Sequence, residues 1–304
     1  MRLWFRTYHD DAPTSPAPAP DRRIFHLPDQ DVGRGMTGID ADPGAVGVDI
    51  YKIGTRPLSA VEQEIPVHPV APVIGADMGT LAYFDHILAN FRDTGELLAP
   101  AEVGCALSHL SVYAEIKRRG RPGIILEEDM SPGRDQLAAA LDFAARTDLP
   151  FVHLGWHPQA EQGVYFLGRH DPRAGAIRVE PAKSFFGAFA YLMSPTAAGE
   201  LLEFQTTALR KADYWSLFFD SASFALYFRP FFAHPEARGN LDSQRRRAAR
   251  WKPRTTTRAL GRFLRSRLRV RWRQWFLGYK PVDRPYVARC FPDDARPEPG
   301  GADG

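Results

Sequence analysis

The sequence predicts an α/β fold in which helices pack against a sheet. From roughly residue 79 to 209, apolar runs of strand length alternate with segments of helical periodicity. The composition, 44% hydrophobic and 25% charged, is that of an ordinary globular chain. Alternation of the two element types is typical of an α/β sandwich. Within it, the stretch from Arg121 to Met130 runs from a Pro-Gly turn through Ile-Ile-Leu to Glu-Glu-Asp, which predicts a buried strand ending in carboxylates.

The first 72 residues give few local signals. Residues 3–8 and 48–53 are both plausible first strands, and the pattern does not choose between them. Residues 12–20 are rich in proline and alanine, which predicts a linker or extended loop. Proline and mixed polarity predict a further loop over residues 59–72.

The helices have clear signals. Leu81, Phe84, Ile87 and Leu88 recur at helical spacing within residues 79–91. Pro100 suits the first turn of the next helix, which is predicted to end with three cationic residues followed by Gly120. Two more helices are predicted over residues 136–146 and 194–209, the second capped by Ser194 with Pro195 at its first position.

Short apolar runs predict the remaining strands. They cover residues 124–126, 151–155, 164–167, 176–179 and 185–193, with a turn at residues 171–175. Small residues within 185–193 indicate close approach by backbone or ligand. The Pro, Gly and Asp-rich segment after Pro281 predicts disorder.

Several classes of protein are disfavoured. No apolar run approaches the roughly 18 residues that a membrane-spanning helix needs. The first ten residues lack the apolar stretch of a signal peptide, so we expect none. The two cysteines are far apart and form no CxxC pair, which disfavours a disulfide scaffold or a zinc site. These features favour a reducing, cytoplasmic setting.

The three carboxylates of Glu127, Glu128 and Asp129 predict a divalent metal. Adjacent carboxylates repel one another, and a bound cation relieves that repulsion. On an extended backbone Glu127 and Asp129 point the same way and can share one ion. Oxygen ligands suit Mg²⁺ or Mn²⁺. The alternative is a solvated acidic turn after a strand.

Three ordered segments carry a resemblance to a known family. They are Glu102–His109 (EVGCALSH), Ile124–Asp129 (IILEED) and Gly187–Ser194 (GAFAYLMS). Their order and spacing over about residues 95–245 resemble glycosyltransferase family 25, which includes bacterial lipooligosaccharide galactosyltransferases and collagen galactosyltransferases. The resemblance implies a GT-A fold, a Rossmann-like α/β/α sandwich that binds a nucleotide sugar through a divalent metal. Glu128 departs from the family pattern, which has Asp there.

The resemblance also implies roles for individual residues. Asp129 and Glu127 would hold Mn²⁺ or Mg²⁺, which would act as a Lewis acid on the leaving diphosphate. Five residues would form the donor site: Glu102, Ser108, His109, Glu128 and Gly187. Ser108 and His109 could instead be a solvent-facing or core pair. Cys105 is expected only to pack, since no partner base indicates a nucleophile.

An inverting transfer also needs a base for the acceptor hydroxyl. Asp213 matches the family's acidic position, and Asp220 lies one to two turns beyond it; either could instead stabilise a helix start. Tyr214 and Trp215 could stack on a sugar, although a core role is the expected one. His234 and Asp242 are weaker metal candidates.

The charge is strongly asymmetric. Residues 243–280 contain 14 Lys and Arg and no acid, which leaves 25 basic against 36 acidic residues elsewhere, a net charge of −11. Within residues 258–279, apolar and aromatic residues follow helical spacing with arginines between them. Such a basic amphipathic arm is typical of an anionic membrane surface. A nucleic-acid partner, a strand over residues 267–273 and a solvated helix on the acidic body are the alternatives.

Taken together, the sequence predicts four regions. They are an irregular N-terminal region (1–48), a GT-A glycosyltransferase domain (49–245), the basic arm (246–281) and a disordered tail (282–304). The expected function is transfer of a hexose, galactose from UDP-galactose, to a lipid-linked or cell-surface glycan such as lipooligosaccharide. The enzyme would be peripheral on the inner face of the cytoplasmic membrane, and no specific nucleic acid is expected. The alternative is a catalytically silent membrane- or nucleic-acid-binding protein that retains the fold.

Overall fold

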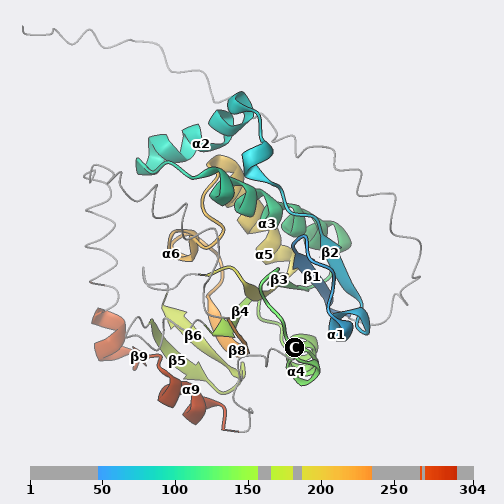
Figure 1. The fold of residues 1–304 in the computed structure, drawn as a ribbon. Coiled ribbons are helices and arrows are strands. Elements are labelled where there is room, and N and C mark those ends of the chain that lie inside the picture. The colour runs from blue at the N-terminus through green and yellow to red at the C-terminus, as the bar shows by residue number, and fades with distance from the viewer. Residues whose placement is uncertain (1–46, 157–165, 181–186, 235–267, 269–270, 293–304) are drawn as a thin grey trace, which may run out of the picture. The chain divides into compact units, whose positions relative to one another are not determined.

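The computed structural model describes residues 47–156, 166–180, 187–234, 268 and 271–292. The chain divides into two compact units, Met1–Thr37 and Gly38–Gly304, and every described residue belongs to the second. The second unit is an α/β structure built on one mixed sheet (Figure 1). The fold class predicted from the sequence is therefore confirmed.

The sheet has nine strands in the described ranges, in the spatial order β2-β1-β3-β7-β4-β8-β6-β5-β9. The strands are β1 (Asp49–Ile53), β2 (Val67–Val70), β3 (Gly123–Glu127), β4 (Phe151–Trp156), β5 (Leu167–Asp171), β6 (Ala176–Glu180), β7 (Ala190–Met193), β8 (Tyr227–Ala233) and β9 (Lys280–Pro281). Strand β1 pairs in parallel with β2 and β3, and β4 pairs in parallel with β8. Strand β7 runs antiparallel between β3 and β4.

The helices surround this sheet. They are α1 (Ala60–Gln63), the 3₁₀ turn η1 (Gly75–Asp77), α2 (Thr80–Thr94), α3 (Pro100–Arg119), α4 (Arg134–Arg146), α5 (Pro195–Thr207), α6 (Trp215–Phe218) and α9 (Arg284–Cys290). Helices α3 and α5 lie side by side, and α4 lies apart from them near the end of β8 (Figure 1).

Strand side chains alternate between two hydrophobic cores. Tyr51, Ile125 and Tyr191 face the core that contains the buried faces of α3 and α5. Ile50 and Ile124, one residue earlier on their strands, face the core that contains α4. The sheet is thus covered on both faces, and the parity of each strand residue decides which helices it meets.

Local signals placed several elements correctly. Of the two possible first strands, β1 matches residues 48–53, whereas residues 3–8 lie outside the described ranges. Helix α3 begins at Pro100 and ends at Gly120, whose φ of 68° is the left-handed conformation that glycine adopts at low cost. Helix α5 has the predicted cap, in which the Ser194 side chain accepts a hydrogen bond from the N–H of Ala197.

The loop predicted over residues 59–72 is wrong. A capping box between Ser59 and Glu62 starts α1, and residues 67–70 form β2. Proline and mixed polarity favour a loop, but β2 is at the edge of the sheet, where Pro69 needs to donate no ladder hydrogen bond.

Other differences concern the bounds of two strands, one further strand and one helix. Strand β5 spans Leu167–Asp171, so it extends to the residue at which the turn was expected to begin. Strand β7 starts at Ala190, later than the predicted run of 185–193. Strand β8 has no counterpart among the strands predicted from the sequence. Residues 284–290 form α9 where disorder was predicted, because the adjacent Val282 and Phe291 are buried in the core.

Candidate active site

The acidic segment lies where β3 leaves the sheet. The strand ends at Glu127, and the N–H of Met130 donates to the carbonyl oxygen of Glu127 at 3.0 Å, which closes a tight turn over Glu128 and Asp129. The extended backbone assumed for these residues is therefore wrong. The turn gives each of the three carboxylates a different set of partners.

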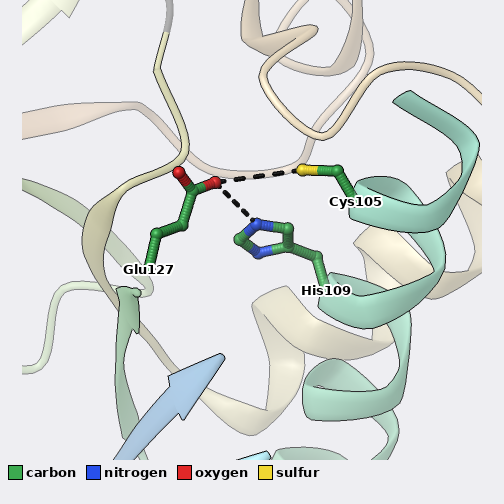
Figure 2. Close-up of side chains that lie close together, drawn as sticks. All are labelled: Cys105, His109 and Glu127. Atoms are coloured by element: carbon green, nitrogen blue, oxygen red, sulfur yellow. Dashed lines mark hydrogen bonds and ion pairs between the residues drawn. The ribbon is translucent and has the colours of Figure 1, made fainter. Parts of the chain in front are cut away.

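Glu127 faces helix α3. Its Oε1 atom lies 3.1 Å from Nε2 of His109 and 3.9 Å from Sγ of Cys105 (Figure 2). The two α3 residues are four apart and so share one face of the helix. Cys105 packs against the core as expected, but its contact with Glu127 was not foreseen.

His109 continues into a buried polar chain. Its Nδ1 atom lies 2.7 Å from the hydroxyl of Tyr191, which lies 2.8 Å from the hydroxyl of Tyr113. His109 is 1% exposed. Burial raises the pKa of both tyrosines, with their mutual interaction and the charge of Glu127 adding to it for Tyr191, so both keep their protons at neutral pH. Two hydroxyls thereby fix the orientation of the imidazole next to Glu127.

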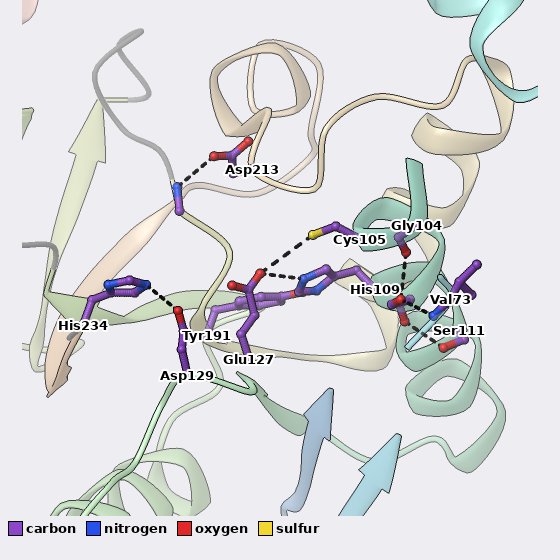
Figure 3. Close-up of polar contacts among 12 residues, drawn as sticks. Val73, Gly104, Cys105, His109, Ser111, Glu127, Asp129, Tyr191, Asp213 and His234 are labelled. Carbon is purple, nitrogen blue, oxygen red and sulfur yellow. Dashed lines mark hydrogen bonds and ion pairs between the residues drawn. The ribbon is translucent and has the colours of Figure 1, made fainter. Parts of the chain in front are cut away.

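Asp129 has a different partner. Its Oδ2 atom lies 3.2 Å from Nε2 of His234, which follows β8 (Figure 3). Burial alone would raise the pKa of Asp129, but the hydrogen bond and charge of His234, a backbone hydrogen bond and the charge of Arg56 outweigh it and lower this pKa. Asp129 is therefore ionised at neutral pH, and its side chain is 48% exposed. His234, predicted as a weaker metal candidate, therefore lies beside Asp129, one of the two residues predicted to hold the metal.

Glu128 contacts the loop after β1. Its Oε1 atom accepts a hydrogen bond from Oγ1 of Thr55 at 3.1 Å and lies 3.2 Å from Nε of Arg56. These contacts join the ends of two neighbouring parallel strands. A contact between Glu128 and a sugar donor stays a prediction.

Asp213 and Gly187 lie together on the other side of the site. The N–H of Gly187 donates to Oδ2 of Asp213 at 3.3 Å; the Asp213 side chain is labelled in Figure 3. The carbonyl oxygen of Gly187 lies 2.8 Å from Nε1 of Trp215 and 3.0 Å from Nε2 of His153. Gly187 has a φ of 97°, which a residue with a Cβ rarely adopts. The backbone of Gly187 thus contacts Asp213 through its N–H and the core residues Trp215 and His153 through its carbonyl oxygen.

Two of the predicted donor residues are buried and bonded within the protein. Ser108 donates to the carbonyl oxygen of Gly104 at 2.7 Å and accepts from the N–H of Val73 at 2.8 Å. Glu102 accepts from the N–H of Ala99 at 2.8 Å and lies 3.3 Å from Nζ of Lys211. Both therefore hold α3 against its neighbours, and their contacts with a donor stay predictions.

The remaining candidates for sugar stacking, proton removal and metal binding lie in different environments. Trp215 is buried in the aromatic core, as expected. The Tyr214 hydroxyl donates to Glu96 at 2.9 Å, and Asp220 is exposed after α6. Asp242 lies outside the described residues.

Sequence reasoning missed two supporting residues. Tyr191 lies within the quoted segment 187–194, but nothing in its spacing shows that it reaches His109. Lys52 lies inside a strand whose five residues are all buried. Lysine is rarely buried unless it is paired, so its position in this strand was a signal that could have identified it. Its Nζ atom donates to the carbonyl oxygen of Met130 at 2.9 Å, directly after the acidic turn.

Comparison with protein families gives one decisive match. Residues 82–215 match the family model described as "Glycosyltransferase family 25 (LPS biosynthesis protein)". Over these residues the chain is similar to glycosyltransferase family 25. The matched region runs from α2 to the start of α6 and contains Cys105, His109, Glu127, Asp129 and Asp213.

The family match establishes the class of the protein. The chain is a glycosyltransferase, an enzyme whose partners are a sugar donor and a glycan acceptor, and the family that residues 82–215 match is described as one of lipopolysaccharide biosynthesis. A comparison with curated proteins gives no match. Among the described helices of this glycosyltransferase, none has both the length and the apolar character needed to cross a bilayer.

Proposed function

We propose that this glycosyltransferase moves a hexose, galactose from UDP-galactose, to a hydroxyl of a lipid-linked or cell-surface glycan such as lipooligosaccharide. The observation that supports this most is that Asp129, Glu127 and Asp213 all lie within the residues that match the family model. Carboxylates at the end of a strand are suited to a metal-bound diphosphate, and a further carboxylate is suited to proton removal.

Asp129 and Glu127 offer the oxygen ligands that a divalent cation prefers, although the turn gives each a different protein partner. Asp129 is half exposed and has a lowered pKa, so it offers a charged oxygen that solvent reaches. Glu127 is 27% exposed and offers a second oxygen. We infer that these two residues hold Mn²⁺ or Mg²⁺, which would supply a Lewis acid for the leaving diphosphate.

Asp213 is the proposed general base. Its Oδ2 atom accepts the Gly187 N–H, and this bond orients the carboxylate. The resemblance to inverting transferases supports removal of the acceptor proton by Asp213 as the acceptor oxygen attacks the sugar. Gly187 would then act by positioning the base as well as by lying next to the donor.

The basic arm supports attachment to a membrane surface. In its described part, residues 271–276 are helical, and four large apolar side chains are exposed: Leu268, Trp272, Trp275 and Phe276. The arm is joined to the sheet, because Arg273 pairs with the buried Glu180 and Arg169 donates to the carbonyl oxygen of Leu277 at 3.4 Å. Exposed tryptophans beside arginines match the interface of an anionic membrane. We infer a peripheral position on the inner face of the cytoplasmic membrane, close to a lipid-linked acceptor.

Titration calorimetry of UDP tests the donor site. UDP is expected to bind in the presence of Mn²⁺, and binding is expected to be lost in Asp129→Ala. Asp135→Ala is the matched control, because Asp135 is an exposed acid six residues further on, in the first turn of α4. If UDP does not bind to the wild type with or without Mn²⁺, the proposed donor is wrong, and the alternative of a silent binding protein gains support.

A further inference from the structure

Cys105, His109 and Glu127 form a compact group of three different ligand types. One ligand atom from each, a sulfur, a nitrogen and an oxygen, lies within 4.8 Å of the other two (Figure 2). The first two side chains come from successive turns of α3, and the third from the end of β3. The group was assembled by tertiary packing, since 18 residues separate His109 from Glu127.

Two of the three distances between these atoms are close to the edges of a zinc coordination tetrahedron. Zinc bonds of about 2.0–2.1 Å to nitrogen and oxygen and about 2.3 Å to sulfur place tetrahedral N and O ligands about 3.3 Å apart, and S and O ligands about 3.6 Å apart. The structure has 3.1 Å between Nε2 of His109 and Oε1 of Glu127, and 3.9 Å between Sγ of Cys105 and Oε1. The third pair, Sγ of Cys105 and Nε2 of His109, lies within 4.8 Å, so an ion would draw these two side chains closer together.

The surroundings of His109 suit a metal ligand. A histidine that binds a metal through one ring nitrogen usually has the other nitrogen held by a hydrogen-bond partner. Here Nδ1 lies 2.7 Å from the Tyr191 hydroxyl, which is itself 2.8 Å from that of Tyr113. With the N–H on Nδ1 donating to Tyr191, the lone pair of Nε2 points toward Glu127 and Cys105.

We propose that Cys105, His109 and Glu127 form a Zn²⁺ site with a fourth position open to solvent or an exogenous ligand. A thiolate and an imidazole favour zinc over Mg²⁺ or Mn²⁺, which prefer oxygen ligands. Binding releases the thiol proton of Cys105 to solvent. Cys105 and Glu127 are partly exposed, so an ion can enter from the solvent side, whereas His109 closes the buried side.

This site shares Glu127 with the proposed donor metal but does not depend on the proposed function. Zn²⁺ bound to Cys105, His109 and Glu127 would occupy the Glu127 carboxylate, so the two metals compete for it. Zinc is therefore expected to weaken the Mn²⁺-dependent binding of UDP in the wild type and to have less effect in Cys105→Ser.

Cobalt spectroscopy tests the site directly. Full-length protein is stripped with a chelator and titrated with Co²⁺, whose thiolate complexes have a charge-transfer band in the near ultraviolet. The band is expected in the wild type and in Cys290→Ser, which removes the other cysteine, and is expected to be absent in Cys105→Ser. Zn²⁺ should abolish the wild-type band, because sites of this type bind Zn²⁺ more tightly than Co²⁺.

Two further variants test the site independently if Cys105→Ser fails to fold. Glu127→Gln, at a partly exposed side chain, should weaken Co²⁺ binding at least tenfold, and Tyr191→Phe should weaken it about tenfold by removing the partner of Nδ1. Absence of the band in the wild type, or its survival in Cys105→Ser, would overturn the proposal. Because these readouts require neither UDP nor Mn²⁺, failure of the donor proposal would leave them unchanged.

Discussion

The Nζ atom of Lys52 lies 2.9 Å from the carbonyl oxygen of Met130, so strand β1 holds the residue that follows the acidic turn. The same Nζ pairs with Glu62 of α1, and both side chains are buried. Glu62 in turn accepts the N–H of Ser59 at 2.7 Å. One buried ion pair thus connects the first strand, the first helix and the backbone next to Asp129.

Lys52→Met is expected to destabilise the protein by about 3–5 kcal/mol, because it leaves the Glu62 carboxylate buried without its cation. The double variant Lys52→Met/Glu62→Gln removes the orphaned charge and keeps an oxygen for Ser59, so it should recover a large part of that loss. Chemical denaturation measures both. A double variant no more stable than the single one would show that the burial of charge is not the dominant cost.

Asp213→Asn separates catalysis from structure at the proposed base. The amide oxygen can still accept the Gly187 N–H, so the melting temperature should stay close to that of the wild type. Loss of a general base should lower kcat about 10²–10⁴-fold. Unchanged turnover of the sugar donor would exclude Asp213 as the base.

Gly187→Ala is the complementary change. At a φ of 97°, a Cβ atom costs about 1–2 kcal/mol, and relaxation of the backbone would move the N–H that Asp213 accepts. We expect a loss of both stability and kcat, measured by denaturation and by initial rates. Gly79→Ala is the matched control, because Gly79 has open space around its Cβ position. Equal effects at the two glycines would contradict this reading.

Asp49 is expected to make stability depend on acid pH. Burial raises the pKa of this carboxyl, but the hydrogen bond of His68 and the charges of Arg121 and Arg119 outweigh it and lower the pKa. A lowered folded-state pKa stabilises the protein above the unfolded value of about 3.9, and that contribution is lost as pH falls through the folded pKa. The difference in unfolding free energy between wild type and Asp49→Asn should therefore be largest near neutral pH and shrink below about pH 4.

Asp148→Asn, at an exposed carboxyl, is the control for that comparison. It should leave the pH dependence of the unfolding free energy close to that of the wild type. A difference between wild type and Asp49→Asn that is constant from pH 7 to pH 3 would contradict the assignment.

The exposed aromatic residues of the arm are expected to bind anionic vesicles. Sedimentation with vesicles containing anionic lipid should capture the wild type and should weaken with added salt, since each basic residue contributes about 1 kcal/mol near such a surface. Trp272→Ser/Trp275→Ser/Phe276→Ser should lose most of this binding. Leu81→Ser/Phe84→Ser, which removes exposed apolar side chains from α2, is the matched control. Binding to RNA but not to vesicles would favour the rival partner.

Local sequence signals were sufficient to predict an element wherever the residues that begin and end it are specific to that type of element. Helix α3 has Pro100 at its first position and Gly120 in the left-handed conformation at its end, and both effects act within one turn of the chain. Strand β8 lacked such signals. The structure stabilises it by pairing with β4 and β6 on its two sides, contacts that arise from distant parts of the chain.

The sequence by itself determined the α/β class, the family and the presence of carboxylates at the end of β3. Only the tertiary structure decided where those carboxylates point. A turn closed by the N–H of Met130 separates Glu127 from Asp129, and the partners of each come from elements 18 or more residues away: His109 for Glu127 and His234 for Asp129. Side-chain direction at a strand end depends on the turn that follows and on the helix packed opposite it, and spacing along the chain specifies neither.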